Sequence, residues 1–170
     1  ANELYETLKA AGVRVKIDDS DNSLGWKCAQ YEMKGVPLRI EIGPRDMENG
    51  VCVAVRRDNF EKTTVEIAEL AKRVPELLED VQKGLYDRAK ANLDEHTKEC
   101  ETMEDVKAFM ESEGGFAKTK WCGELACELK MKDEAGVSSR CMPLVQSGTV
   151  GKCVCCGKEA TTDIFWGVAY

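Results

Sequence analysis

The chain has 170 residues, room for one domain or two small ones, and its content of 43% hydrophobic and 32% charged residues is that of a globular protein. Its net charge of −7, from 24 Lys and Arg against 31 Asp and Glu, excludes a protein that coats nucleic acid without specificity. No apolar run reaches the roughly 18 residues of a membrane span, and no secretory signal opens the chain. The odd number of cysteines, nine, favours a reducing compartment, so we expect a cytoplasmic protein without membrane partners.

Hydrophobic periodicity predicts alternating helices and strands in the first part of the chain. A helix is expected over 2–11, and a strand over 13–17, where apolar and charged residues alternate strictly. A second helix is expected over 24–34, before a glycine and a proline that stop it. The elements expected next are a strand over 37–42, a turn over 43–46 and a central, continuously apolar strand over 50–57.

Helices are predicted for the middle of the chain and short strands for its end. One helix is expected from about Thr64, and a separate one begins at Pro75, because proline suits the first turn of a helix. A shorter helix is expected over 103–111, and beyond Gly114 glycines, cysteines and short strands dominate, as in a small metal-stapled module. The domains expected are an α/β domain over 1–74 and, over 75–170, a connecting helix followed by a small α+β metal-binding domain.

Four cysteines near the end of the chain are spaced as metal ligands. Cys122 and Cys127 form a C-x4-C pair, and Cys153 and Cys156 form a C-x2-C pair. Each pair supplies two thiolates from one turn, which is what a closed tetrahedral Zn²⁺ site needs. Gly157, directly after the second pair, suits a turn that requires a positive φ. Four thiolates leave no open position, so the sequence predicts a structural zinc ion.

The remaining cysteines and the single histidine show no second pattern. Cys155 lies inside the C-x2-C pair and is expected to be a bystander. His96 sits on a charged helix that offers no Ser or Cys constellation for catalysis, so no catalytic residue is expected. The competing interpretations of the quartet are reduced cysteines without metal and a thiol redox pair, although a redox motif usually opens a helix after a strand. The cysteines expected to be ordinary core or surface residues are Cys28, Cys52, Cys100 and Cys141.

A second candidate site is a set of charged residues between positions 27 and 46. Arg39 and Glu41 share one face of a predicted strand. A guanidinium binds guanine O6 and N7 as a fork, and a carboxylate accepts from base amino groups, so such a mixture suits the recognition of single-stranded bases. From spacing alone, ordinary surface salt bridges remain the competing interpretation. The members of the set are Lys27, Glu32, Lys34, Arg39, Arg45 and Asp46.

Two parts of the sequence carry a resemblance to a known family. The run from Asp18 to Asp46 resembles the anticodon-binding domain of class II aminoacyl-tRNA synthetases, and within that class prolyl-tRNA synthetases of the archaeal and eukaryotic type. The motifs that carry this first resemblance are Gly25-Trp26-Lys27, Gly35-Val36-Pro37-Leu38-Arg39 and Gly43-Pro44-Arg45-Asp46. The motifs that resemble the same enzyme's C-terminal zinc domain are Trp121-Cys122-Gly123, Ser139-Arg140-Cys141-Met142-Pro143 and the run from Cys153 to Lys158.

The resemblance implies a mixed sheet, flanked by helices, that reads the proline anticodon, whose second and third bases are guanines. It also implies that the cysteine quartet holds the family's zinc ion. The roles implied by motif position are base contacts for Glu32 and Arg39, guanine readout for Arg45 and Asp46, and backbone contacts for Lys27 and Lys34.

The resemblance also implies parts that this sequence does not contain. The family joins proline to tRNA(Pro) through an adenylate, using ATP and Mg²⁺, in a catalytic domain whose motif arginines are absent here. We therefore expect this chain to be inactive alone and to be part of a homodimeric enzyme. The family's first strand, before the first helix, is also missing, so the sheet is expected to be one strand short with an exposed edge. The alternative function is a zinc-stapled protein-interaction module without tRNA specificity.

Overall fold

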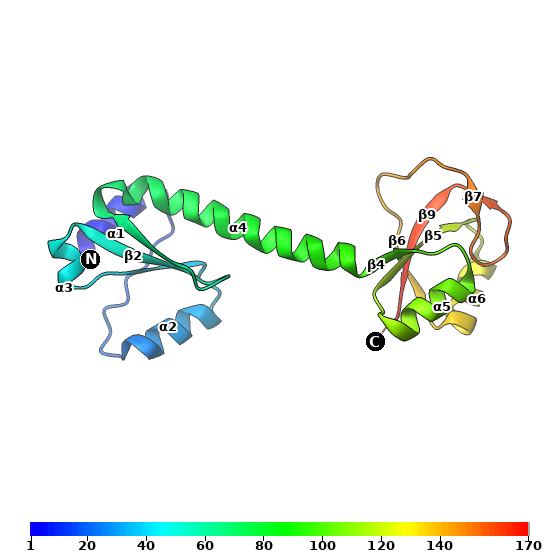
Figure 1. The fold of residues 1–170 in the computed structure, drawn as a ribbon, viewed down its shortest axis with the longest axis horizontal. Helices are drawn as coiled ribbons and strands as arrows, with labels where there is room; N and C mark the ends of the chain where they lie inside the picture. The colour runs from blue at the N-terminus through cyan, green and yellow to red at the C-terminus, as the bar shows by residue number, and fades with distance from the viewer. Residues whose placement is uncertain (170) are drawn as a thin grey trace. The chain divides into compact units, whose positions relative to one another are not determined.

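The computed structural model describes residues 1–169, and Tyr170 lies outside the described part (Figure 1). The chain divides into two compact units, Ala1–Ala89 and Lys90–Tyr170, called unit 1 and unit 2 below. Each unit has its own hydrophobic core, and the two cores share no residue. The expectation of two modules, an α/β part followed by an α+β part rich in cysteine, is confirmed.

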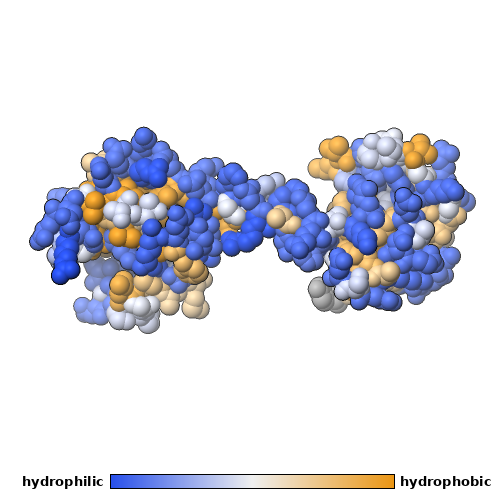
Figure 2. Space-filling view, in the orientation of Figure 1, coloured by the Kyte–Doolittle hydropathy of each residue, from blue (hydrophilic) through white to orange (hydrophobic). Residues whose placement is uncertain are grey.

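Helix α4 (Leu70–Glu95) contains the boundary between the two units. The sequence placed the domain boundary at residues 74/75, within this helix, and Val74 and Leu77 on either side of that position both pack in the core of unit 1. The surface of this helix is mostly hydrophilic (Figure 2). No helix within residues 1–169 combines the length and the apolar character needed to cross a bilayer.

Unit 1 is built on a three-stranded antiparallel sheet of β1 (Leu38–Glu41), β2 (Val51–Arg56) and β3 (Lys62–Glu66), with β2 in the centre. Successive side chains of a strand point to opposite faces, so Leu38 faces the core and Arg39 faces away from it. Helix α1 (Asn2–Ala10) and the start of α4 cover the core face, and helix α2 (Leu24–Met33) lies on the other side of the sheet (Figure 1). The central position predicted for the strand over 50–57 is confirmed.

The segment over 13–17, predicted as a strand, is not one. Val13 and Val15 pack against the core while Arg14 and Lys16 are exposed, so the alternation of apolar and charged residues does reflect one-sided burial. A strand also needs a neighbouring backbone to form its ladder, and in the described part of the chain this segment pairs with none. Strand β1 accordingly lies at an edge of the sheet.

The predicted turn over 43–46 is instead the start of a short helix, α3 (Pro44–Glu48). Pro44 occupies the first helical position, where its missing N–H costs nothing. Asp46 Oδ2 accepts a hydrogen bond from the Gly43 N–H at 2.8 Å and so satisfies a donor at the helix start. The Gly-Pro signal marked a change of chain direction correctly but did not distinguish a turn from the first turn of a helix.

The helix predicted from about Thr64 begins later, because Thr64 belongs to strand β3. A 3₁₀ turn over Ile67–Glu69 then leads into α4. Pro75 was expected to start a new helix, but it lies inside α4, where an interior proline costs about 3 kcal/mol. Leu77 and Val81 are buried directly after it, and burial of each contributes about 1.5–3 kcal/mol, which is enough to keep the helix continuous.

Unit 2 is built on a four-stranded sheet in the order β4-β5-β9-β6, with β4 parallel to β5 and the other pairs antiparallel. Its core includes Phe109, Met131 and Trp166. The helix predicted over 103–111 is confirmed, whereas the next helix was missed because its buried side is formed by few residues. The elements are β4 (Thr97–Glu99), α5 (Met103–Ser112), β5 (Phe116–Trp121), α6 (Leu125–Ala135), β6 (Ser138–Cys141), β7 (Gly151–Lys152), β8 (Glu159–Ala160) and β9 (Thr162–Gly167).

A buried ion pair ties a long loop to this sheet. Lys120 Nζ of β5 lies 2.7 Å from Asp163 Oδ1 of β9, and the two side chains are 17% and 5% exposed. The other carboxylate oxygen of Asp163 accepts a hydrogen bond from the Ser147 backbone N–H at 2.7 Å. The loop over 142–150 is thereby anchored at its middle, although Leu144 on the same loop is fully exposed.

Candidate metal centre and candidate nucleic-acid interface

The cysteine quartet is assembled from two turns of unit 2. Cys122 follows β5, and Cys127 lies in the first turn of α6. Cys153 and Cys156 come from the turn between β7 and β8. In that turn the Gly157 N–H donates to the Cys153 carbonyl at 2.9 Å, and Gly157 has a φ of +70°, the positive value that the sequence predicted after the second cysteine.

The four sulfur atoms of the quartet all lie within 4.8 Å of one another. Cys122 Sγ is 3.6 Å from Cys127 Sγ and 3.8 Å from Cys156 Sγ, and all four residues are free cysteines. These separations exceed the ~2.05 Å of a disulfide and match the roughly 3.8 Å between ligands that a tetrahedron with bonds of about 2.3 Å requires. The quartet could therefore hold one metal ion in a closed shell. No other group of three or more potential ligands of this kind is found within residues 1–169.

The four thiols differ in their surroundings. Cys127 and Cys153 are buried, whereas Cys156 is exposed. Burial raises the pKa of Cys127. Burial also acts to raise the pKa of Cys153, but the backbone N–H groups of Cys156 and Cys155 outweigh it and bring that pKa to about 7. A bound cation would stabilise every thiolate of the quartet, because a coordinating thiol is deprotonated.

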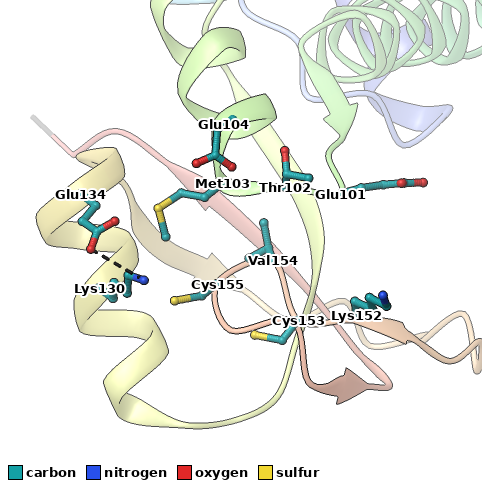
Figure 3. A pocket seen from close by; sticks show the side chains of 11 residues that line it. Glu101, Thr102, Met103, Glu104, Lys130, Glu134, Lys152, Cys153, Val154 and Cys155 are labelled. Carbon is teal, nitrogen blue, oxygen red and sulfur yellow. Dashed lines mark ion pairs between the residues drawn. The ribbon is translucent and has the colours of Figure 1, made fainter.

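A shallow pocket of about 290 Å³ lies beside the C-x2-C turn (Figure 3). Its lining comes from the start of α5, from α6 and from the turn itself, and includes the ion pair between Lys130 and Glu134. Cys155 lines this pocket and lies outside the group of four sulfur atoms. Of the cysteines expected to be ordinary, Cys52 and Cys100 are buried in the two cores, where burial raises the pKa of each thiol.

In unit 1, the guanidinium of Arg39 is held between two carboxylates. Its Nη1 donates to Glu32 Oε1 at 2.7 Å, and its Nε donates to Glu41 Oε1 at 2.8 Å. Glu32 comes from α2 and Glu41 from the same face of β1, so the three side chains connect the helix to the sheet. Burial acts to lower the pKa of Arg39, but the hydrogen bonds to Glu32 and Glu41 outweigh it and raise the pKa. A guanidinium has five N–H donors, so three remain for an external acceptor.

The two predicted lysines of this region have different partners. Lys27 Nζ donates to the Asp18 carbonyl at 3.2 Å and lies 3.6 Å from the Asp18 carboxylate. Hydrogen bonds from the hydroxyl and the backbone N–H of Ser20, with a smaller effect of Lys27, lower the pKa of Asp18 to about 2. Lys34 caps the end of α2, is exposed, and places its Nζ 5.4 Å from the centroid of the Tyr31 ring. Lys27 is thus engaged within the protein, whereas Lys34 is accessible to a ligand.

Arg45 and Asp46 lie in α3, one element beyond β1. Arg45 is exposed, and no carboxylate of residues 1–169 lies within 4.0 Å of its guanidinium. Asp46 uses Oδ2 for the Gly43 N–H, which leaves Oδ1 as an acceptor. The contacts of the structure therefore join Glu32 and Arg39 into one network, but they do not connect Arg45 and Asp46 to it.

One cation near this network was missed by the sequence interpretation because strand β3 was not predicted. The ladder register places Arg39 opposite Val55 and Val55 opposite Lys62. Residues opposite one another in a ladder point to the same face, so Lys62 and Arg39 share one face and one row of the sheet. The alternation of exposed residues at Lys62, Thr64 and Glu66 was the signal that could have identified the strand.

Known proteins with similar sequences are proline–tRNA ligases. The chain is 48% identical over 170 residues to the proline–tRNA ligase of Clostridium novyi, which covers 100% of this chain and 35% of that protein. It is 50% identical over 170 residues to proline–tRNA ligase 2 of Bacillus cereus, covering 100% of this chain and 36% of the relative. A crystal structure of prolyl-tRNA synthetase from Cryptosporidium parvum complexed with L-proline and AMP matches 99% of this chain and 36% of its own, with a TM-score of 0.91 and 37% identity. The chain thus spans about a third of the length of these relatives.

Family models match both units of the chain. Residues 1–77 match the model described as an anticodon binding domain, and residues 103–170 match the model described as prolyl-tRNA synthetase, C-terminal. The fold and these two matches place the chain among the class II aminoacyl-tRNA synthetases. The chain belongs to the prolyl-tRNA synthetase family, of which it represents the anticodon-binding and C-terminal domains.

Proposed function

We propose that this chain selects tRNA(Pro) by its anticodon and supplies the metal-stapled C-terminal domain of a prolyl-tRNA synthetase. The observation that carries the proposal is the guanidinium of Arg39, which Glu32 and Glu41 orient while three of its N–H donors stay available. This group lies in the unit that matches an anticodon binding domain. A pre-oriented guanidinium is suited to base recognition because it loses little conformational freedom on binding.

Within this function, Arg39 and Arg45 read the guanines at the second and third positions of the proline anticodon. A guanidinium binds guanine O6 and N7 as a fork, which no other base offers in the same geometry. Glu32 orients Arg39 and keeps one carboxylate oxygen for a base amino group, and Asp46 Oδ1 is available for the same purpose. Lys34, which is exposed, contacts the tRNA backbone, and Lys27 joins it by exchanging its contact with Asp18 for a phosphate.

The metal of the quartet is proposed to be Zn²⁺, with a structural role. The support is the donor set, because four thiolates at tetrahedral spacing suit zinc and leave no position for water or substrate. The ligands are Cys122, Cys127, Cys153 and Cys156.

The complete enzyme would attach proline to tRNA(Pro) with ATP and Mg²⁺ in a catalytic domain outside this chain. The support is that the chain covers only about a third of relatives that are proline–tRNA ligases. We accordingly propose that the isolated chain binds tRNA but does not activate proline, and that the enzyme works in the cytoplasm as a homodimer.

Replacing Arg39 or Arg45 by Ala is expected to cost about 1–3 kcal/mol of binding free energy with tRNA(Pro), and to leave binding of an anticodon-swapped tRNA nearly unchanged. The binding free energy falls because the guanine O6 and N7 atoms then have no guanidinium to bind them. Fluorescence anisotropy with both tRNAs, at one fixed salt concentration, measures the difference. Arg73→Ala, which removes an exposed guanidinium from α4, serves as the matched control.

Two results would contradict this assignment. If both variants keep the wild-type preference for the cognate anticodon, neither guanidinium reads a guanine. Alternatively, the wild-type chain binds both tRNAs weakly and equally, and the interaction-module interpretation then replaces tRNA selection.

A further inference from the structure

Two lysines from separate segments converge on the ring of Tyr31. Lys16 Nζ, from the unpaired segment over 13–17, lies 5.5 Å from the ring centroid, and Lys34 Nζ, from the end of α2, lies 5.4 Å from the same centroid. Both side chains belong to exposed residues, while Tyr31 is half-buried. The negative π face of an aromatic ring attracts an ammonium group at such a distance.

This pair of positive charges has no neutralising partner in the described part of the chain. No carboxylate of residues 1–169 lies within 4.0 Å of Lys16 or Lys34. The Asp18 carboxylate, which interacts with Tyr31, is already engaged by Ser20 and Lys27. Two like charges on one ring repel each other, and an anion placed between or beside them would relieve that repulsion.

The position of the pair indicates which anion it meets. Tyr31 directly precedes Glu32 in α2, and Glu32 is the residue that orients Arg39. Lys34 ends the same helix, and Lys16 reaches the Tyr31 ring from the segment over 13–17, so the pair of charges lies beside the helix that supports the base-reading group. In complexes of proteins with nucleic acids, contacts to phosphates fix the register of the protein, and contacts to bases supply its specificity. We propose that Lys16 and Lys34, positioned by the Tyr31 ring, form a clamp for the sugar-phosphate backbone of the anticodon arm. This inference rests on the proposed tRNA selection.

The clamp predicts a change in salt dependence and not in base preference. Each phosphate contact to a single strand adds about 0.7 to the slope of log K against log[salt]. Lys16→Gln and Lys34→Gln should therefore each lower that slope by about 0.7, and the double variant by about 1.4, while the cognate-to-swapped affinity ratio stays constant. The slope is measured by anisotropy with tRNA(Pro) and with the anticodon-swapped tRNA across a salt series.

The chain offers a matched control for this experiment. Lys9 Nζ lies 5.4 Å from the Tyr5 ring in α1, on the core side of the sheet and away from α2, so Lys9→Gln removes the same kind of charge and contact elsewhere in unit 1. Its salt slope should equal that of the wild type. The ring is tested separately, because Tyr31→Phe keeps the π face and the slope, whereas Tyr31→Leu should lower the slope without removing any charge.

The outcomes separate this inference from the proposed function. If the lysine variants keep the wild-type slope while the cognate preference persists, the clamp is wrong and anticodon selection stands. If they lose the cognate preference without a change in slope, the lysines contact bases and the clamp is again overturned. If the wild-type chain shows no preference between the two tRNAs, the proposed function itself fails.

Discussion

Removing the metal from the cysteine quartet is expected to unfold unit 2 and to leave unit 1 folded. Structural zinc contributes about 10–16 kcal/mol to small zinc modules, which is comparable to or larger than the roughly 5–15 kcal/mol that holds a whole domain together. The quartet joins the turn before α6 to the turn between β7 and β8, and Cys127 and Cys153 are buried there with Ala160. Val154 of the second turn also packs in the core of unit 2 and donates its N–H to the Lys120 carbonyl at 3.0 Å, but a backbone hydrogen bond contributes only about 0.5–1.5 kcal/mol, far less than zinc binding.

Tryptophan fluorescence can follow the two units separately. Trp121 packs against the quartet and Trp166 lies in the core of unit 2, whereas Trp26 is exposed on α2 of unit 1. In a Trp26→Phe background, the remaining indoles therefore report on unit 2 alone. Addition of EDTA should shift their emission to longer wavelength, and elemental analysis before treatment should find about one zinc per chain.

A pair of serine variants identifies the ligands. Cys153→Ser should reduce the zinc content and unfold unit 2, whereas the neighbouring Cys155→Ser should keep both the metal and the emission spectrum. Chelation that removes zinc without changing the fluorescence would contradict a structural role. Full zinc content in Cys153→Ser would contradict the ligand assignment.

Breaking the Lys120–Asp163 pair is expected to have the second largest effect. Removal of one partner of a buried pair costs about 3–5 kcal/mol, because the other charge is left without compensation. Asp163→Asn should lower the free energy of unfolding by about 3 kcal/mol, the lower end of this range, because the Lys120 side chain is 17% exposed and can reach water. The change would also weaken the acceptor for the Ser147 N–H and so release the loop over 142–150. Urea unfolding of the full chain measures the loss.

The same pair predicts a dependence of stability on pH. The hydrogen bond from Lys120, with that from the Ser147 N–H, lowers the pKa of Asp163 to about 2, below the roughly 3.9 of an unfolded aspartate. A group with a lowered pKa stabilises the fold fully above its unfolded pKa, and this contribution is lost as the pH falls from about 4 towards 2. Asp163→Asn should remove that part of the pH profile.

An exposed pair of the same unit provides the control. Lys118 and Glu99 lie 2.8 Å apart, but the Glu99 side chain is 79% exposed, so Glu99→Gln should change stability by less than about 1 kcal/mol. If Asp163→Asn were as mild as Glu99→Gln, or if its acid unfolding matched that of the wild type, the ion pair would have no special role in holding the loop.

Local signals in the sequence predicted much of the fold. The helices over 24–34 and 103–111 have their hydrophobic spacing and their stop signals within a single segment, and both are confirmed. Strand β3 was missed and the segment over 13–17 was mistaken for a strand, because a ladder depends on a partner elsewhere in the chain. The helix start predicted at Pro75 was wrong for a similar reason, because the burial of later residues of α4 outweighs the cost of a proline inside the helix.

For the candidate sites too, local sequence signals predicted the residues, and tertiary contacts decided which of them meet. The sequence by itself determined the four potential metal ligands, since the spacing within each cysteine pair and the glycine after the second pair are properties of single turns. It also supplied the charged residues of the candidate anticodon site, through the motif around Arg39. Only the tertiary structure decided that the two cysteine pairs meet within 4.8 Å, that Glu32 and Glu41 both bind Arg39, and that Lys16 joins Lys34 at the Tyr31 ring. These contacts join segments that no local pattern connects, and the packing of each unit's core determines which of them meet.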